Sequence, residues 1–181
     1  MSIPIYEATD NGKSTDGVKY IFITKGNSST VKAIDFSYAR NLYGMKIYNL
    51  AFAVYNPKND TIDDTVTANG DVYAVFNTVL STIPKFFKSF QNAVIIVKGS
   101  DSSLKFVQRC KLTCRKNCSG ICKNQHRRIK VYNNYIAKNY DALKKDYSFL
   151  GGILDLDDQT VIEKYIPKRM YNSILVLNNN V

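Results

Sequence analysis

An apolar stripe along residues 72–90, followed almost at once by a short apolar run, constrains the fold of this chain more than any other feature. The apolar side chains of the stripe recur every three or four residues, which is the spacing of one face of an α-helix. They are Val72, Val75, Phe76, Val79, Leu80, Ile83, Phe86, Phe87 and Phe90. Asn69 or Asp71 is placed to cap this helix, and Pro84 predicts a kink because proline removes a backbone hydrogen bond. Residues 93–97 are apolar throughout, so we expect a strand that is buried on both faces.

The residues before the stripe predict short β-strands. Runs rich in β-branched and aromatic side chains occupy 20–24, 31–36 and 46–55, and turn-forming residues close the first and the last of them. Such short connections favour an antiparallel meander. We therefore expect an α+β fold in which an antiparallel sheet packs on the long amphipathic helix.

The residues after the stripe are less strongly patterned. Helical spacing returns at 128–140, and residues 141–147 either extend that helix or form a second one. Residues 149–154 fit a strand or a turn. Two further segments, 161–165 and 173–177, fit a helix or a strand equally well.

The chain has 181 residues, of which 45% are hydrophobic. This suits a single domain over 1–181, which buries roughly two-thirds of the surface that its unfolded form exposes. The chain has no run of about 18 apolar residues and no signal-peptide pattern at its start, so we expect a cytoplasmic protein with no membrane partner. It also lacks a phosphate-binding Gly-rich loop, a Ser nucleophile elbow and a dinucleotide fingerprint. Substrate and oligomeric state stay open.

Several short motifs resemble those of an uncharacterised family of small bacterial proteins, a domain of unknown function. The motifs are Tyr-Asn-Leu-Ala-Phe at 48–52, Asp-Asp at 63–64, Asn-Gly-Asp at 69–71 and Gly-Ser at 99–100, with Arg127, Arg128 and Tyr132 as counterparts of an Arg-x-Arg-x-Tyr helix. The resemblance covers residues 18–172 and implies a compact α+β domain in a bacterial cytoplasm, but no activity. It also implies that residues 101–126 are an insertion, because in the family the Gly-Ser turn leads almost directly into that helix.

The insertion holds every cysteine of the chain and its only histidine, each four residues from the next. These residues are Cys110, Cys114, Cys118, Cys122 and His126. Zinc prefers four thiolate or imidazole ligands at the corners of a tetrahedron, and clustered thiols in a reducing compartment more often bind metal than form disulfides. On one continuous helix the outer cysteines would lie about 18 Å apart, so the segment has to bend, and Ser119-Gly120 offers the bend. We expect a structural zinc site with these five residues as candidate ligands.

The cysteine spacing leaves other chemistry open. It differs from the Cys-x2-Cys pairs of most zinc sites, so a disulfide or redox switch, or free thiols in a flexible insertion, are alternatives. An iron–sulfur cluster is disfavoured because the spacing matches no common cluster-binding run. A catalytic zinc is disfavoured because the segment has no carboxylate that could act as a base.

The positive charge of the chain is concentrated in the same place. Nine of its 25 Lys and Arg residues lie within residues 105–130, which contain no Asp or Glu, and the other 16 are nearly balanced by 15 acidic residues. The nine are Lys105, Arg109, Lys111, Arg115, Lys116, Lys123, Arg127, Arg128 and Lys130. Clustered cations neutralise phosphates, so we expect DNA or RNA as the partner, or a ribonucleoprotein, with an acidic protein as the alternative. Small size and charge also suggest, without any motif, a component of a toxin–antitoxin or defence module.

An enzymatic alternative is a ribonuclease or phosphodiesterase. Carboxylates in the first half could hold Mg²⁺ while arginines stabilise a phosphoryl group, or arginine and tyrosine could cleave RNA without metal. The candidates are Asp63, Asp64, Asp71, Arg127, Arg128 and Tyr132. The acids also suit turns and helix starts for structural reasons, so binding is favoured over catalysis.

Overall fold

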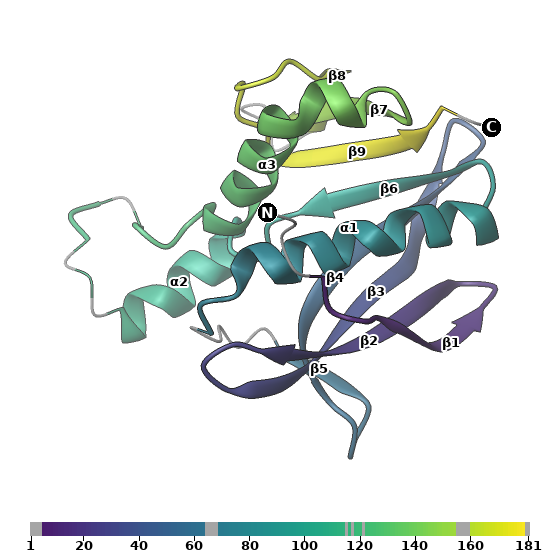
Figure 1. Ribbon diagram of the computed structural model, residues 1–181. Coiled ribbons are helices and arrows are strands. Elements are labelled where there is room, and N and C mark those ends of the chain that lie inside the picture. Colours follow the sequence, from purple (N-terminus) through teal and green to yellow (C-terminus); the bar gives the residue numbers. More distant parts are fainter. Residues whose placement is uncertain are drawn as a thin grey trace. The chain divides into compact units, whose positions relative to one another are not determined.

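The computed structural model describes residues 5–63, 69–114, 116, 118–120, 122–154 and 160–179. Within these ranges the chain has nine strands and three helices, which confirms the α+β class (Figure 1). It divides into two compact units, Met1–Ala93 and Val94–Val181. That the whole chain forms one domain stays a prediction.

The first unit contains a meander of antiparallel strands. They are β1 (Thr9–Ser14), β2 (Gly17–Lys25), β3 (Ser29–Leu42), β4 (Met45–Asn56) and β5 (Thr61–Asp63). Each of the first four pairs with the next along the chain, and β5 pairs with β4. The three predicted strands are confirmed and extend further than predicted. The sequence does not predict β1 or β5. All residues of β1 are exposed, and β5 has three residues, so neither strand has an apolar pattern.

Helix α1 (Val72–Ser89) follows the predicted apolar stripe. The ring of Phe86, fully buried, stacks on that of Phe36 in β3 with 4.5 Å between centroids, and it also meets Tyr48 of β4 at 5.2 Å. These contacts join the apolar face of the helix to two neighbouring strands. The expected cap differs, because the Asp71 side chain makes no capping hydrogen bond and only its carbonyl accepts one, from the Val75 N–H.

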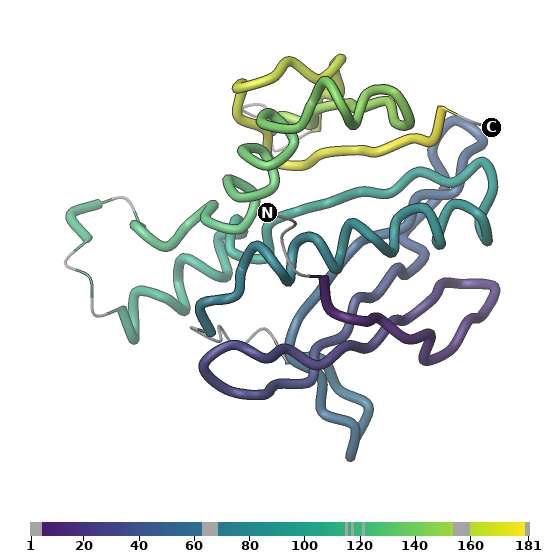
Figure 2. Tube along the Cα trace, viewed as in Figure 1, coloured from purple at the N-terminus to yellow at the C-terminus, as the bar shows by residue number. Residues whose placement is uncertain are grey.

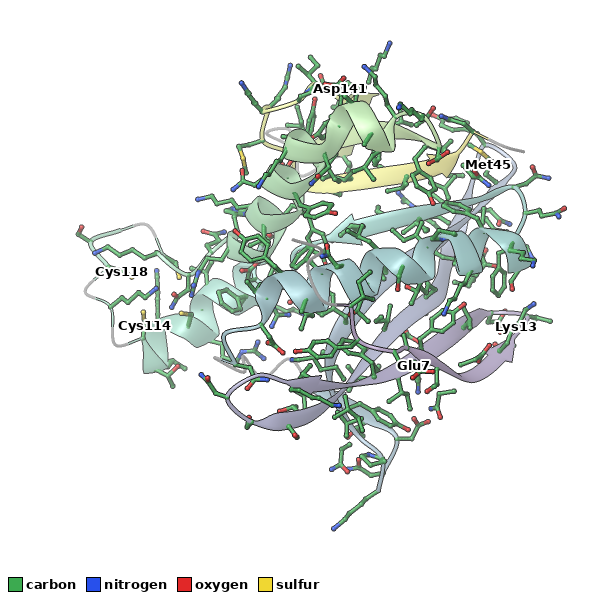
Figure 3. The ribbon with its side chains drawn as sticks, viewed as in Figure 1. Glu7, Lys13, Met45, Cys114, Cys118 and Asp141 are labelled. Atoms are coloured by element: carbon green, nitrogen blue, oxygen red, sulfur yellow. The ribbon has the colours of Figure 1, made fainter. Side chains whose placement is uncertain are left out.

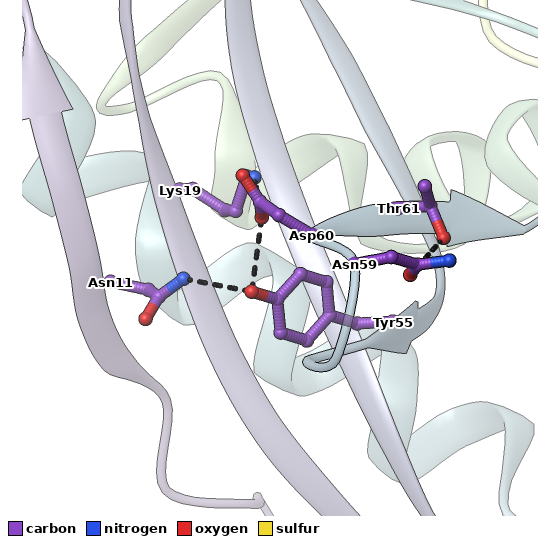
Figure 4. A network of polar contacts seen from close by, with 6 residues as sticks. All are labelled: Asn11, Lys19, Tyr55, Asn59, Asp60 and Thr61. Carbon is purple, nitrogen blue, oxygen red and sulfur yellow. Dashed lines mark hydrogen bonds and ion pairs between the residues drawn. The ribbon is translucent and has the colours of Figure 1, made fainter.

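A polar network joins β1, β2 and the turn between β4 and β5 (Figure 4). The hydroxyl of Tyr55 donates to Asp60 over 3.0 Å and accepts from Asn11 over 3.5 Å. Lys19 pairs with the same Asp60 oxygen at 2.8 Å, and this bond lowers the pKa of Asp60 and raises that of Lys19. The network fixes the turn against the neighbouring strands.

The second unit contains four strands and two helices. They are β6 (Ala93–Lys98), α2 (Leu104–Thr113), α3 (Arg127–Leu143), β7 (Tyr147–Leu154), β8 (Thr160–Lys164) and β9 (Ser173–Asn178). The strands lie in the order β6-β9-β7-β8, with antiparallel neighbours, so the two segments left open between helix and strand are strands. The described residues between β6 and α3, which include α2, extend away from these strands (Figure 2).

Helix α3 is fastened to the second unit by a buried amide. Asn133 donates from its side chain to the Tyr171 carbonyl over 3.1 Å, and its own carbonyl accepts from the Tyr165 hydroxyl over 3.3 Å. Ile129 and Ile136, also buried, complete the face of α3 that packs inward. The start of this helix is therefore held in place. This fixes the C-terminal end of the segment before it, residues 101–126, which is called the cysteine-rich segment below.

Candidate functional site

The cysteine-rich segment consists of a helix, a reversal and a return to α3. Ser103 caps α2 by accepting a hydrogen bond from the Phe106 N–H over 3.2 Å, and the helix ends at Thr113 with Cys114 as its C-cap. Gly120 then has a φ of 86°, in the left-handed region that glycine adopts without strain. The predicted break of the helix and the bend at Ser119-Gly120 are thereby confirmed.

The reversal brings the four thiols together. The Sγ atoms of Cys114 and Cys118 lie 3.8 Å apart, and both residues are labelled in Figure 3. Cys110 is in hydrogen-bonding contact with Cys114 on one side and Cys122 on the other. All four cysteines are free, and the series Cys122, Cys110, Cys114, Cys118 runs without interruption.

Amide groups point at these sulfurs. The side-chain amide of Asn124 donates to Cys110 over 3.3 Å and to Cys114 over 3.6 Å, and the backbone N–H of Lys123 donates to Cys118 over 3.4 Å. The bond from Asn124 is the main cause that lowers the pKa of the Cys110 thiol. The contacts with Cys122 and Cys114 and the charge of Lys116 act in the same direction, against the effect of burial. The surroundings therefore favour a thiolate at Cys110.

Two hollows lie beside the thiols, and one of them also reaches the histidine. The larger, of about 750 Å³, is lined by Cys114, Cys118 and Cys122 together with Lys111 and Lys116. The smaller, of about 310 Å³, is lined by His126 and Lys130 among others and shares Cys122 and Ser119 with the first. The structure therefore brings the four predicted cysteine ligands together, and His126 lines a hollow that it shares with Cys122.

The thiols are not arranged around one point. In the described ranges, no group of three or more His, Cys, Asp or Glu side chains has the geometry of a preformed metal site. Zinc binding therefore stays a prediction. What the structure adds is that the thiols contact one another in series rather than around a common centre.

Several of the predicted cations lie beside this cluster, because Lys111 and Lys116 line the larger hollow and Lys123 and Lys130 line the smaller one. Seven of the nine are exposed: Lys105, Arg109, Lys111, Lys116, Lys123, Arg127 and Lys130. Arg128 is half-buried and donates to the Ser100 hydroxyl, whereas Arg115 lies outside the described residues. As far as the structure describes the chain, none of Lys105, Arg109, Lys111, Lys116, Arg127 and Lys130 forms an ion pair with a carboxylate.

Asp101 is a structural anchor that the sequence analysis missed. It is 5% exposed, its carboxylate accepts from the Arg128 N–H over 2.9 Å, and its carbonyl accepts from the His126 N–H over 3.2 Å. It therefore caps α3 from the far end of the cysteine-rich segment and fixes the ends of the segment to each other. An acid directly after the Gly-Ser at the end of a strand was the available signal.

Of the three candidate acids in the first unit, Asp71 is the one whose side chain the structure describes. The Asp71 carboxylate accepts from the Tyr6 hydroxyl over 2.9 Å and from the Asn69 amide over 3.3 Å. Asp63 pairs through its backbone with Val54, its side chain is not among those described, and Asp64 lies outside the described residues. The structure therefore assigns Asp71 to holding the start of α1.

Tyr132, the remaining catalytic candidate, is half-buried on α3. Burial is the main cause that raises the pKa of its phenol, and the charge of Arg128 lowers that pKa to a smaller extent. The phenol therefore stays protonated at neutral pH, where it could donate a proton but not accept one. Because it is half-buried, Tyr132 also presents less ring surface to a base than an exposed tyrosine would.

The fold and these residues define an α+β protein with a basic segment built around four free thiols. The chain belongs to a family of unknown function, DUF6934, whose model matches residues 3–113. The expected relationship to an uncharacterised domain family is confirmed. The match continues through α2 and ends before Cys114, so the limits of the insertion at 101 and 126 stay predictions.

Other comparisons add no relative to this family assignment. No significant match was found among curated proteins or among solved structures. None of the described helices has the length and hydropathy needed to span a bilayer.

Proposed function

We propose that this protein binds nucleic acid through its cysteine-rich basic segment, residues 101–130, and that a zinc ion holds that segment in shape. Cys110, Cys114, Cys118 and Cys122 are the ligands in this proposal. One observation carries it: the four thiols contact one another in series within a segment whose exposed residues include seven cations.

The distance between the thiols supports zinc as the occupant. Four thiolates about 2.3 Å from one zinc ion, at the corners of a tetrahedron, lie roughly 3.8 Å from one another. The Sγ atoms of Cys114 and Cys118 already have a separation of 3.8 Å. Cys110 contacts Cys114, and Cys122 contacts Cys110, so rotations about the side-chain bonds of these two residues would complete the set.

The groups around the thiols also suit a metal site. Hydrogen bonds from amides to coordinated sulfur orient the ligands, and Asn124 and the Lys123 backbone are placed to supply them. Four thiolates around Zn²⁺ carry a net charge of −2, which Lys111 and Lys116 at the same hollow would offset. His126 is left out of this ligand set and remains beside Cys122.

Phosphate binding follows from the charge of the surface. If four of the exposed cations contact phosphates, the affinity falls with the salt concentration with a slope of about −3.6 on logarithmic axes. A fourfold rise in salt, from 50 to 200 mM, then weakens binding by roughly 150-fold. An acidic protein partner would also respond to salt, so nucleic acid has to be tested directly.

Metal content is the first test. Protein purified without added metal or chelator should contain about one zinc per chain, with its thiols protected from a thiol reagent. Cys114→Ser with Cys118→Ser should lose the metal, whereas His126→Ala should retain it. Protein without metal and with four freely reactive thiols would overturn the zinc part of the proposal.

Binding is the second test. Fluorescence anisotropy with labelled duplex DNA, single-stranded DNA and RNA should show binding with the salt dependence given above. A charge-reversed pair, Lys111→Glu with Lys116→Glu, should abolish it, while Lys145→Glu with Lys168→Glu, two exposed lysines of the same unit, should change it little. Failure to bind any nucleic acid at 50 mM salt would overturn the proposal and direct the search to an acidic protein. RNA that is degraded during these experiments, with loss of cleavage in Arg128→Ala, would favour the enzymatic alternative.

A further inference from the structure

We infer that α2 is the element that recognises base sequence, and that it does so by lying in the major groove of duplex DNA. The inference rests on the proposed function and deepens it, because nucleic-acid binding alone does not require any sequence preference. It assigns Gln108 and Arg109 to the edges of bases and leaves the other cations to phosphates.

Helix α2 presents one continuous exposed face. Leu104, Lys105, Gln108, Arg109 and Leu112 are all exposed and occupy about 140° of the helix circumference. The two leucines are 72% and 86% exposed, and no residue of this helix is buried. Among the residues that the structure describes, none covers these two leucines, so this face of the helix is open to a partner.

The opposite face of α2 packs inward, and this packing keeps the exposed face turned toward solvent. Phe106, Val107 and Cys110 are half-buried, and Cys110 joins the thiol series. The N-terminus of the helix is fixed by the Ser103 cap, close to the end of β6. The thiol cluster therefore holds one side of α2 and turns the other outward.

The exposed side chains match the groups in a major groove. An α-helix fits the B-DNA major groove, which is about 12 Å wide, and ten residues span about 15 Å. Glutamine forms paired hydrogen bonds with adenine, arginine forms them with guanine, and apolar side chains contact the thymine methyl group. Gln108, Arg109 and Leu112 supply one of each kind on one face. Lys105, on the same face, and Lys111, at the edge of this face, are assigned to phosphates.

The side chains of this surface favour duplex DNA over single strands, and the shape of the groove favours DNA over duplex RNA. Single strands are bound by stacking bases on aromatic rings, and in the described part of residues 101–130 the exposed large apolar side chains are leucines. The major groove of an RNA duplex is too deep and narrow for a helix to reach the bases. The chemistry of α2 therefore fits B-form DNA.

The test begins with selection of bound duplexes from a randomised pool at 150 mM salt. The affinities of wild type, Gln108→Ala and Gln91→Ala are then measured for the selected duplex and for a scrambled duplex. Gln91 is an exposed glutamine outside the segment and serves as the matched control. We expect the wild type to prefer the selected duplex by at least about 100-fold. Gln108→Ala should reduce that preference about tenfold with little change in its affinity for the scrambled duplex, and Gln91→Ala should leave both unchanged.

Three results would overturn the inference while the proposed function stands: equal affinity for both duplexes, no effect of Gln108→Ala on the preference, or single strands bound as tightly as duplexes. Absence of salt-dependent binding to any nucleic acid would instead show that the proposed function has failed, and the inference with it. Gln108→Ala substitutes a strong helix former at an exposed position, so its folding is not at risk. Its circular dichroism spectrum should match that of the wild type.

Discussion

A single buried amide, Asn69, ties the turn between β2 and β3 to the start of α1. It is 3% exposed, its side-chain N–H groups donate to Thr24, Ser28 and Asp71, and its side-chain oxygen accepts from Ser28. We predict that Asn69→Ala lowers the free energy of unfolding by about 2 kcal/mol, because it leaves several buried groups without a partner. Urea unfolding followed by circular dichroism measures the change.

Asn59 is the matched control at the residue scale. Its side chain accepts one exposed hydrogen bond from Thr61 over 2.7 Å, so Asn59→Ala should change the unfolding free energy by less than about 0.5 kcal/mol. Equal effects of the two substitutions would contradict the role assigned to Asn69.

At the scale of elements, α2 depends on the thiol cluster for its stability. A helix of ten residues is marginal in water by itself, and this one has no buried residue. On the proposed zinc site, we predict that chelation of the metal raises the rate of amide hydrogen exchange in residues 104–113 by at least about tenfold. Mass spectrometry of peptic fragments measures this exchange, and the amides of β9, a strand paired on both sides, should keep their protection.

Comparison of Cys114→Ser with Ser119→Ala tests whether the stability of α2 depends on the thiol itself. The first should reproduce the effect of chelation in residues 104–113, while the second, at an exposed neighbour, should behave as wild type. Unchanged exchange in Cys114→Ser would mean that α2 is stable without the cluster.

The sequence predicts those elements in which buried apolar residues recur at a regular spacing. Helix α1, helix α3 and strand β6 were predicted because a buried face recurs at the helical or strand spacing. Exposed β1 has no such face, and 161–165 could not be assigned because strand and helix formers are mixed there. The candidate site was also predicted only in part. The regular spacing of the thiols can be seen in the sequence, whereas the capping role of Asp101 depends on a contact with a residue 27 positions away.

Burial of tyrosines sets the response of the whole molecule to alkali. The chain has 13 tyrosines, and burial is the main cause that raises the pKa of Tyr20, Tyr48 and Tyr171, and that of Tyr165 to about 12. A tyrosine whose pKa is higher in the folded state than in the unfolded state keeps its proton longer when folded. The unfolded chain therefore loses protons first as the pH rises, and the folded state loses stability from the unfolded value near 10 up to the folded value.

We predict a free energy of unfolding that shows no tyrosine-linked change from pH 7 to about 10 and then falls steeply toward pH 12. Tyr165→Phe should reduce the slope of this fall, because phenylalanine does not ionise, even though the substitution also loses the hydrogen bond to the Asn133 carbonyl. Tyr43→Phe, at a side chain that is 90% exposed, is the matched control substitution. Urea titrations at several pH values, each followed to the unfolding midpoint, measure the slope. The bond to the Asn133 carbonyl exists only while the phenol is protonated, so its loss lowers the unfolding free energy below the titration but not above it, which also makes the fall of the variant less steep. A slope that is the same in wild type and Tyr165→Phe would therefore show that Tyr165 titrates alike in the folded and unfolded chain.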